Sequence, residues 1–298
     1  MNVSLDESYA YCKKLSKRTA RNFYFSFLGL PADKSRAMCA LYAFMRKCDD
    51  LGDDTSLSVA RRSKNLDAWQ QALIAGLAND FRQTEADRLI PETRKIFPAL
   101  IDVVARFGIP REYLFAVIDG VRMDLAPTGF ETFEELSTYC YHVAGAVGLC
   151  CIHIWGFHGD DATKYAVDCG NAFQLTNILR DLGEDIRMSR VYLPREDMRR
   201  FGYSVDDLTN CKRGAAFEEL MQFEVERTRS YYRRAEHLFD YLDPTGKPIL
   251  RAMIKLYGGL LDKIERRRYD VFSRPVALPK WQKLVVAAEA IIRRRWIR

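Results

Sequence analysis

Apolar residues along this chain recur every three or four positions, and no stretch alternates apolar and polar residues over the length of a strand. That period is typical of an α-helix, whereas a half-buried strand requires a period of two. Glycine and proline fall between the helical stretches, for example at residues 108–110, 127–129 and 244–246. We therefore expect an all-α protein of about ten helices, forming a single domain over residues 1–298.

Capping residues support this division into helices. A side-chain oxygen placed just before a helix can accept a hydrogen bond from an N–H group of the first turn. Thr132, followed three residues later by Glu135, has the pattern of a capping box. The other expected caps are Asp33, before a helix through Cys48, and Asp160, before a helix through Asp185.

Composition limits the class of protein. The chain has 298 residues, of which 48% are hydrophobic and 29% charged, and these fractions exclude a disordered or low-complexity chain. A chain of this size buries roughly three quarters of its unfolded surface, enough to enclose an internal cavity. The net charge of +6 is small and unclustered, unlike the basic surface of a nucleic-acid-binding protein. We expect no nucleic-acid partner, and no feature of the sequence indicates a protein partner.

The cysteines and the termini bear on location. The eight cysteines include no C-x-x-C pair and no alternation with histidine, so we expect reduced thiols in the core rather than zinc ligands. Polar and acidic residues occupy the N-terminus where a signal peptide would have its apolar stretch. The longest apolar run, residues 143–157, is shorter than the roughly 20 residues needed to span a bilayer. We expect a cytoplasmic protein.

The helix expected over residues 37–54 carries charge on one narrow face. Tyr42, Arg46, Asp49 and Asp53 fall on that face at about 100° per residue, whereas most other directions are apolar. A helix that is apolar nearly all round is a buried helix. The carboxylates of this first acidic stripe are therefore expected to point into the protein.

A second helix repeats the arrangement. Gln174, Asn177, Asp181 and Asp185 are spaced by three, four and four residues and lie on one face of an otherwise apolar helix. We call this set the second acidic stripe. Two buried helices thus each present carboxylates four residues apart.

The two acidic stripes together require a counter-charge. An uncompensated buried carboxylate costs several kcal/mol, and Arg46 and Arg180 are too few to neutralise four aspartates. Carboxylate and amide oxygens suit Mg²⁺, which binds phosphate oxygens alongside one or two carboxylates. The sequence therefore predicts a site for a diphosphate bridged by Mg²⁺. The alternative is that both stripes are ordinary solvated surface, which is the commoner origin of an acidic helical face.

Small residues mark the helix expected over residues 139–151. Ala144 and Gly148 lie on one face of it, with Gly145 beside them. Glycine inside a helix costs roughly 0.5–1 kcal/mol relative to alanine, so it usually admits a close neighbour. That neighbour is either the backbone of another helix or an apolar chain of the substrate, in a cavity supplemented by Phe23, Phe25 and Phe27.

Six segments in order resemble one protein family. They are residues 22–24, 40–53, 119–125, 139–148, 174–185 and 190–194. These segments are similar to those of the squalene and phytoene synthase family, and the likeness runs through most of the chain. Residues 269–272, Tyr-Asp-Val-Phe, resemble the bacterial members.

The resemblance implies the isoprenoid synthase fold, a helical bundle around a central cavity, and head-to-head (1′-1) joining of two prenyl diphosphates. By position, Asp49 and Asp53 would hold Mg²⁺ on one diphosphate, and Asn177, Asp181 and Asp185 would do so across the cavity. The four aspartates, together with Tyr139 near the reacting carbons, would be the catalytic residues.

The resemblance also implies a set of substrate contacts. The matching positions are Arg21, Asn22, Tyr24, Tyr42, Arg46, Gln174, Arg180 and Tyr257. Arg190 and Tyr192 match the pair that follows the second acidic helix and closes over diphosphate. One position departs from the family, because many members have serine where this chain has Asn22.

The sequence leaves the product open. We favour farnesyl diphosphate and a C30 product (squalene, dehydrosqualene or presqualene diphosphate), and geranylgeranyl diphosphate with a C40 product is the alternative. No G-x-G-x-x-G loop follows a strand, so nothing in the sequence indicates a site for NADPH, although a squalene product would require it.

Two other kinds of protein compete with this interpretation. A terpene cyclase or a chain-elongating prenyl transferase uses similar aspartate stripes, and a non-catalytic helical scaffold could share the fold.

The basic C-terminal segment, with arginines at residues 293–295 beside Trp296, allows peripheral contact with anionic lipid at the inner membrane.

Overall fold

The computed structural model describes residues 3–19, 27, 29–78, 88–125 and 129–279. Within these ranges the regular structure is helical, and β pairing is limited to two isolated bridges. The elements are α1 (Leu5–Thr19), α3 (Ala32–Asp53), α4 (Val59–Leu77), α6 (Thr93–Phe107), α7 (Arg111–Met123), α8 (Phe133–Cys140), the π-helix η1 (Tyr141–Gly145), α9 (Ala146–Trp155), α10 (Asp161–Arg187), α11 (Arg195–Arg200), α12 (Val205–Thr209), α13 (Ala215–Ala235), α14 (Leu238–Tyr241) and α15 (Lys247–Arg266). The predicted all-α class is confirmed. The helices outnumber the expected ten because several, such as α12 and α14, are very short. That all of residues 1–298 form a single domain stays a prediction.

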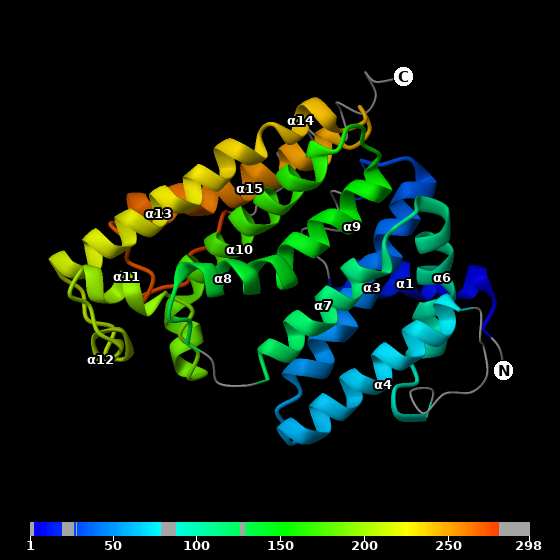
Figure 1. Cartoon of the computed structure of the whole chain (residues 1–298), viewed down its shortest axis with the longest axis horizontal. Helices are drawn as coiled ribbons and strands as arrows, with labels where there is room; N and C mark the ends of the chain where they lie inside the picture. The colour runs from blue at the N-terminus through cyan, green and yellow to red at the C-terminus, as the bar shows by residue number, and fades with distance from the viewer. Residues whose placement is uncertain (1–2, 20–26, 28, 79–87, 126–128, 280–298) are drawn as a thin grey trace.

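The helices form two groups that meet along α7, η1 and α9 (Figure 1). In the first group α3 packs against α1, α4, α6 and α7. In the second group α10, the longest helix, packs against α13 and α15. Because α9 and η1 contact both groups, the two helices that carry the acidic stripes, α3 and α10, lie on either side of them.

Of the three capping residues predicted from the sequence, one caps its helix in the structure. Thr132 and Glu135 form the predicted capping box. Asp33 is not a cap, because the chain enters α3 through Pro31 and places Asp33 inside the first turn, and α3 continues past Cys48. Asp160 has the cap position of α10, but its side chain makes no capping hydrogen bond, and α10 continues to Arg187.

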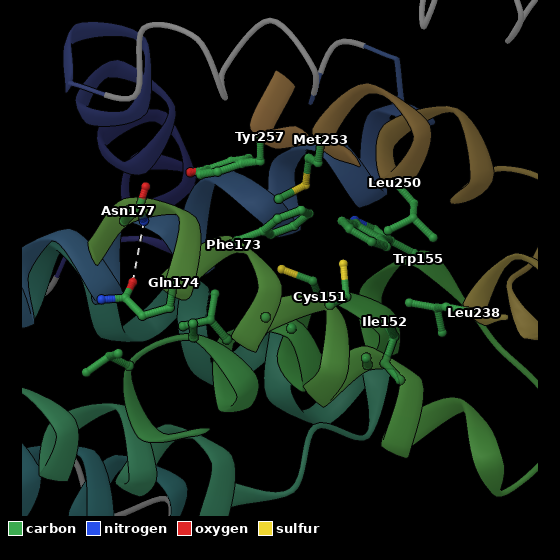
Figure 2. Close-up of a pocket in the computed structure, with 17 residues that line it drawn as sticks. Cys151, Ile152, Trp155, Phe173, Gln174, Asn177, Leu238, Leu250, Met253 and Tyr257 are labelled. Carbon is green, nitrogen blue, oxygen red and sulfur yellow. Dashed lines mark hydrogen bonds between the residues drawn. The ribbon is translucent and has the colours of Figure 1, made fainter. Parts of the chain in front are cut away.

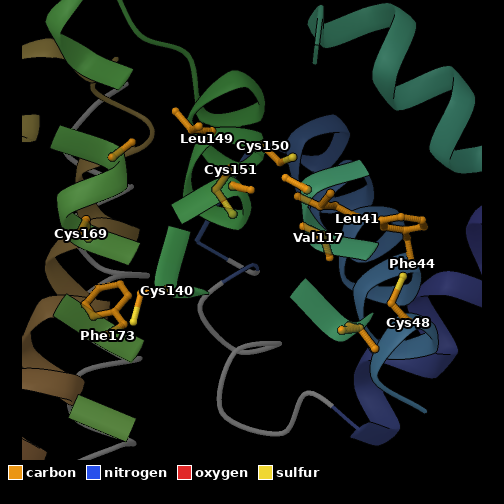
Figure 3. Packing of buried hydrophobic residues seen from close by; sticks show 14 of the residues in the cluster. Leu41, Phe44, Cys48, Val117, Cys140, Leu149, Cys150, Cys151, Cys169 and Phe173 are labelled. Carbon is orange, nitrogen blue, oxygen red and sulfur yellow. The ribbon is translucent and has the colours of Figure 1, made fainter. Parts of the chain in front are cut away.

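Cysteines belong to the core, as expected, with one exception. Seven of the eight are buried and all are free thiols. Figure 3 shows Cys48, Cys140, Cys150 and Cys169 among buried apolar side chains. Burial raises the pKa of the Cys140 and Cys169 thiols, which keeps them protonated and unreactive. Cys211 is exposed, in a turn outside the helices.

The small residues of η1 and α9 mark a close approach of α10. A Cβ added to Gly148 would lie 2.8 Å from the carbonyl oxygen of Ala166, and one added to Gly170 would overlap the carbonyl of Ala144. The explanation by a neighbouring helix backbone is therefore confirmed. The regular helix expected here is wrong in one detail, because residues Tyr141–Gly145 form a π-helix. Such segments are frequent at functional sites.

No helix in the described part of the chain is long and apolar enough to cross a membrane.

Candidate active site

The first acidic stripe reaches a cavity of about 420 Å³. Tyr42 and Asp49 of α3 line it. Many groups surround Asp49, but its side chain is exposed to solvent through the cavity that it lines. The side chain of Asp53 is 68% exposed, so the expectation that the carboxylates of this stripe point into the protein is wrong for Asp53. Burial, reinforced by the charge of Asp53, raises the pKa of Asp49 to about 7. The nearby guanidinium of Arg46 does not cancel this effect, because it forms an ion pair with Asp50 at 2.6 Å.

The second acidic stripe lies on α10. Gln174 lines the cavity and accepts a hydrogen bond from Nδ2 of Asn177 at 3.4 Å. The Oδ1 atom of Asn177 is buried and has no hydrogen-bond partner among the described residues. Arg180 forms a bidentate ion pair with the carboxylate of Asp181. Burial, reinforced by the charge of Asp181, raises the pKa of Asp185 to about 7.

A carboxylate that the sequence analysis left without a role organises the two aromatic residues of the site. Asp124, directly after α7, accepts hydrogen bonds from Tyr139 Oη and from Tyr192 Oη, both at 3.0 Å. The two rings stack with centroids 5.3 Å apart. Burial raises the pKa of Tyr139, so its hydroxyl stays protonated and donates. Asp124 belongs to the family-like segment 119–125, and the signal that could have identified it is a carboxylate at the end of an apolar helix.

Asp124 and Arg190 connect the two stripes. Nη2 of Arg190, just beyond α10, lies 3.5 Å from Oδ1 of Asp53 at the end of α3. The charge of Asp124 contributes to the raised pKa of both Asp49 and Asp185. The contacts join Arg190 to Asp53 of the first stripe and Tyr192 to Asp124, so the predicted Arg190 and Tyr192 pair lies beside the end of α3. Asp181 and Asp185 of the second stripe are not among the described residues that line the cavity.

The cavity has a polar end and an apolar remainder. Apolar side chains of α3, α7 and α9 form most of its wall, and Asp49, Asp124 and Gln174 supply its charged and polar groups. A second cavity of about 200 Å³ lies between α9, α10 and α15 (Figure 2). Tyr257 and Gln174 line both cavities. The ring of Tyr257 stacks on Phe173 at 4.5 Å.

The donor set fits Mg²⁺ held together with a phosphate ligand. No group of three or more His, Cys, Asp or Glu side chains in the described ranges is close enough to hold a metal alone. Mg²⁺ usually keeps several waters and binds one or two carboxylates plus substrate phosphates, so such a cage is not required. The unpartnered Oδ1 of Asn177 and the raised pKa values of Asp49 and Asp185 show where a cation would relieve the electrostatic cost.

Some predicted residues cannot be placed. Arg21, Asn22 and Tyr24, with the neighbouring Phe23 and Phe25, lie outside the described residues. Phe27 is described and lines the larger cavity, where its ring meets the edge of Tyr42 with centroids 6.5 Å apart.

Comparison with known proteins decides the family. The model of the squalene/phytoene synthase family matches residues 16–282. This chain belongs to that family. It is accordingly an enzyme that transfers prenyl groups, and its all-α architecture is the isoprenoid synthase type. The terpene cyclase, the chain-elongating transferase and the non-catalytic scaffold are set aside.

Relatives differ in the product that their names give. The 15-cis-phytoene synthase of Synechococcus elongatus is 35% identical, over 98% of this chain and 94% of its own. The phytoene synthase of Arthrospira platensis is 34% identical, over 97% of this chain and 94% of its own. A solved dehydrosqualene synthase matches with a TM-score of 0.82 at 27% identity, covering 96% of each chain. The squalene synthase HpnC from Alicyclobacillus acidocaldarius matches with a TM-score of 0.81 at 25% identity, covering 90% of this chain and 97% of its own.

Proposed function

We propose that this enzyme catalyses the Mg²⁺-dependent head-to-head condensation of two farnesyl diphosphates to a C30 product through a cyclopropylcarbinyl diphosphate. The observation that carries the proposal is that Asp49 of the first acidic stripe and Gln174 of the second line one largely apolar cavity, together with Asp124. Asp49 lines that cavity, and both Asp49 and Asp185 have raised pKa values that a bound cation would lower.

The residues of the two acidic stripes and two arginines would bind the diphosphate end of the substrates. Asp49 and Asp53 would hold Mg²⁺ on one side, and Asn177, Asp181 and Asp185 would hold it on the other. The bound metal would neutralise the negative charge that develops on a departing diphosphate. Beside the acidic stripes, the guanidinium groups of Arg180 and Arg190 are placed to bind phosphate oxygens.

The chemistry requires a cation that survives in a dry cavity. Loss of diphosphate with its electron pair leaves an allylic cation, and the double bond of the second substrate attacks it. Loss of a proton then closes the cyclopropane ring. The ring of Tyr139 lines the cavity while its hydroxyl is held by Asp124, so its face is available to stabilise positive charge. The apolar wall excludes the water that would quench the cation.

Chain length is proposed from the apolar end of the cavities. Trp155 lines both cavities away from the polar groups, and a side chain of that size favours the shorter farnesyl chain. The two solved C30 synthases, both with TM-scores above 0.8, support this choice. Geranylgeranyl diphosphate is the second candidate, favoured by the phytoene synthases at 34–35% identity.

The proposal is tested by incubating purified protein with farnesyl or geranylgeranyl diphosphate and Mg²⁺, with and without NADPH, and identifying the lipid. Asp49→Ala and Asp181→Ala should abolish diphosphate release in a folded protein. Asp54→Ala is the matched control, because this exposed carboxylate bonds only Ser56 among the described residues and should leave the rate unchanged. Turnover in the Asp49 or Asp181 variant, or no magnesium dependence, contradicts the proposal.

A cytoplasmic location with peripheral contact at the inner membrane stays a prediction. The basic residues that motivate it, including Trp296, lie outside the described residues.

A further inference from the structure

The side chain of Trp155 forms part of the wall of both cavities. Trp155 is the last residue of α9 and is 4% exposed. It lines the cavity of about 420 Å³ and also the cavity of about 200 Å³. Figure 2 shows its indole in the smaller cavity near Leu238 and Leu250, at the end opposite to Asn177 and the hydroxyl of Tyr257. A chain whose diphosphate lies at the polar end therefore extends toward Trp155.

The backbone around Trp155 is held from three directions. The carbonyl oxygen of Trp155 accepts a hydrogen bond from Nζ of Lys34 at 2.5 Å. Gly156, which ends α9, has a φ of +89°, and a Cβ there would overlap the carboxylate of Asp243. A Cβ on Gly246 would lie 2.9 Å from Cβ of Trp155. These contacts fix the backbone and the Cβ position from which the indole enters the two cavities.

The indole is held by packing and not by a polar contact of its own. Its Nε1 is buried and has no hydrogen-bond partner among the described residues. Replacing Trp155 by phenylalanine therefore removes volume without breaking a hydrogen bond of the side chain.

We propose that Trp155 sets the length of both prenyl chains at once, by closing the apolar end of the two cavities that hold them. This inference deepens the proposed function and rests on it for the reaction. Val143, Val147, Cys151 and Met253 also line both cavities, but Trp155 has the largest side chain of the apolar residues shared by the two cavities. Leu250 and Ile152 line only the smaller cavity, and Leu41 and Val117 line only the larger one. A change at those positions would lengthen one cavity, whereas a smaller residue at 155 would lengthen both.

The test is a graded series, Trp155→Phe, Trp155→Leu and Trp155→Ala. For each variant, kcat/KM is measured with farnesyl and with geranylgeranyl diphosphate, and circular dichroism checks folding. A single methylene in a hydrophobic pocket changes discrimination by roughly 10- to 200-fold. We expect the geranylgeranyl-to-farnesyl ratio to rise with each reduction in volume, by at least about tenfold for the smallest folded variant. If Trp155→Ala does not fold, the phenylalanine and leucine variants still decide.

Leu250→Ala is the matched control, because Leu250 is an apolar wall residue of the smaller cavity alone. Given both substrates, it should form a mixed C35 product with little C40 product, whereas Trp155→Ala should form C40. A ratio that does not change along the Trp155 series overturns the inference, as does a C40 gain in Leu250→Ala equal to that in Trp155→Ala. Failure of the proposed function differs from both outcomes, since the unmodified enzyme would then release no diphosphate from either substrate or would already prefer geranylgeranyl diphosphate.

Discussion

Replacement of Arg227 by methionine should destabilise the protein far more than the loss of an ordinary ion pair. Arg227 of α13 donates to the carboxylate of Asp197 at 2.7 Å and to both carboxylate oxygens of Glu224 at 3.0 Å. The side chains of Asp197 and Glu224 are only 6% and 2% exposed. The guanidinium also lies over the rings of Phe133 and Phe223, at 4.0 and 4.5 Å from their centroids.

The magnitude follows from the charges that remain. Burial raises the pKa of Glu224 to about 8, so at neutral pH it holds a proton and the cluster is balanced by one carboxylate and one guanidinium. Arg227→Met leaves the carboxylate of Asp197 buried without its cation. Removing one partner of a buried ion pair costs about 3–5 kcal/mol, which corresponds to a loss of roughly 5–8 °C in Tm for a chain of this size.

The cost should depend on pH in a known direction. Without the guanidinium, the negative charge left in this buried cluster favours proton uptake by the folded variant as the pH falls. The Tm deficit should therefore be largest at about pH 8 and shrink at about pH 5. Melting curves of both proteins, followed by circular dichroism at the two pH values, measure this deficit.

Arg233→Met is the matched control on the same helix. Arg233 pairs with Glu226 at 2.8 Å, but both side chains are more than 60% exposed. An exposed pair contributes about 0.2–1 kcal/mol, so its loss should change Tm by no more than about 2 °C. A deficit for Arg227→Met as small as that of the control, or one that is the same at both pH values, would refute the reasoning.

The remaining predictions concern helix packing and the titration of the site. Gly170→Ala should lower Tm, because its Cβ would overlap the carbonyl of Ala144 and overpacking costs about 1–3 kcal/mol. Gly258→Ala, where the described residues place no atom within 4 Å of the added Cβ, should raise Tm, because alanine favours a helix by about 0.5–1 kcal/mol; shifts of the same sign in the two variants contradict this. The raised pKa values of Asp49 and Asp185, both about 7, mean that the folded state retains protons that the unfolded state has lost. Metal-free protein should therefore lose stability as the pH rises from about 4 to about 7, and Mg²⁺ binding with a diphosphate should release protons near pH 7. Calorimetry in buffers of different ionisation enthalpy measures that release, and its absence would contradict the metal assignment.

The sequence predicts the elements that depend on local spacing. Helical periodicity predicts α3 and α10, and the spacing along one helix places Asp49 on the side of α3 that lines the cavity. The Thr132 capping box is equally local, because its two hydrogen bonds join residues three apart.

Features that depend on contacts distant in sequence could not be predicted in the same way. Asp124 meets Tyr139 and Tyr192 across 15 and 68 residues, so its role appears only once α7 and α8 are placed beside the segment after α10. The sequence does not distinguish Trp155 from the other apolar residues, because its place in the walls of both cavities depends on the tertiary structure.

Two acidic clusters in this protein show why the cavity indicates an external cation. Around Arg227 the chain supplies its own cation, and the carboxyl groups are closed off from solvent. In the cavity Arg46 and Arg180 are engaged with Asp50 and Asp181.

The raised pKa values of Asp49 and Asp185 therefore persist next to arginines. The side chain of Asp53 is 68% exposed, which gives hydrated ions access to the first acidic stripe. A solvated acidic surface would explain Asp53 alone, whereas Asp49 opens onto a cavity whose wall is largely apolar. An open acidic cluster with too little positive charge of its own is the arrangement expected where Mg²⁺ arrives together with a diphosphate.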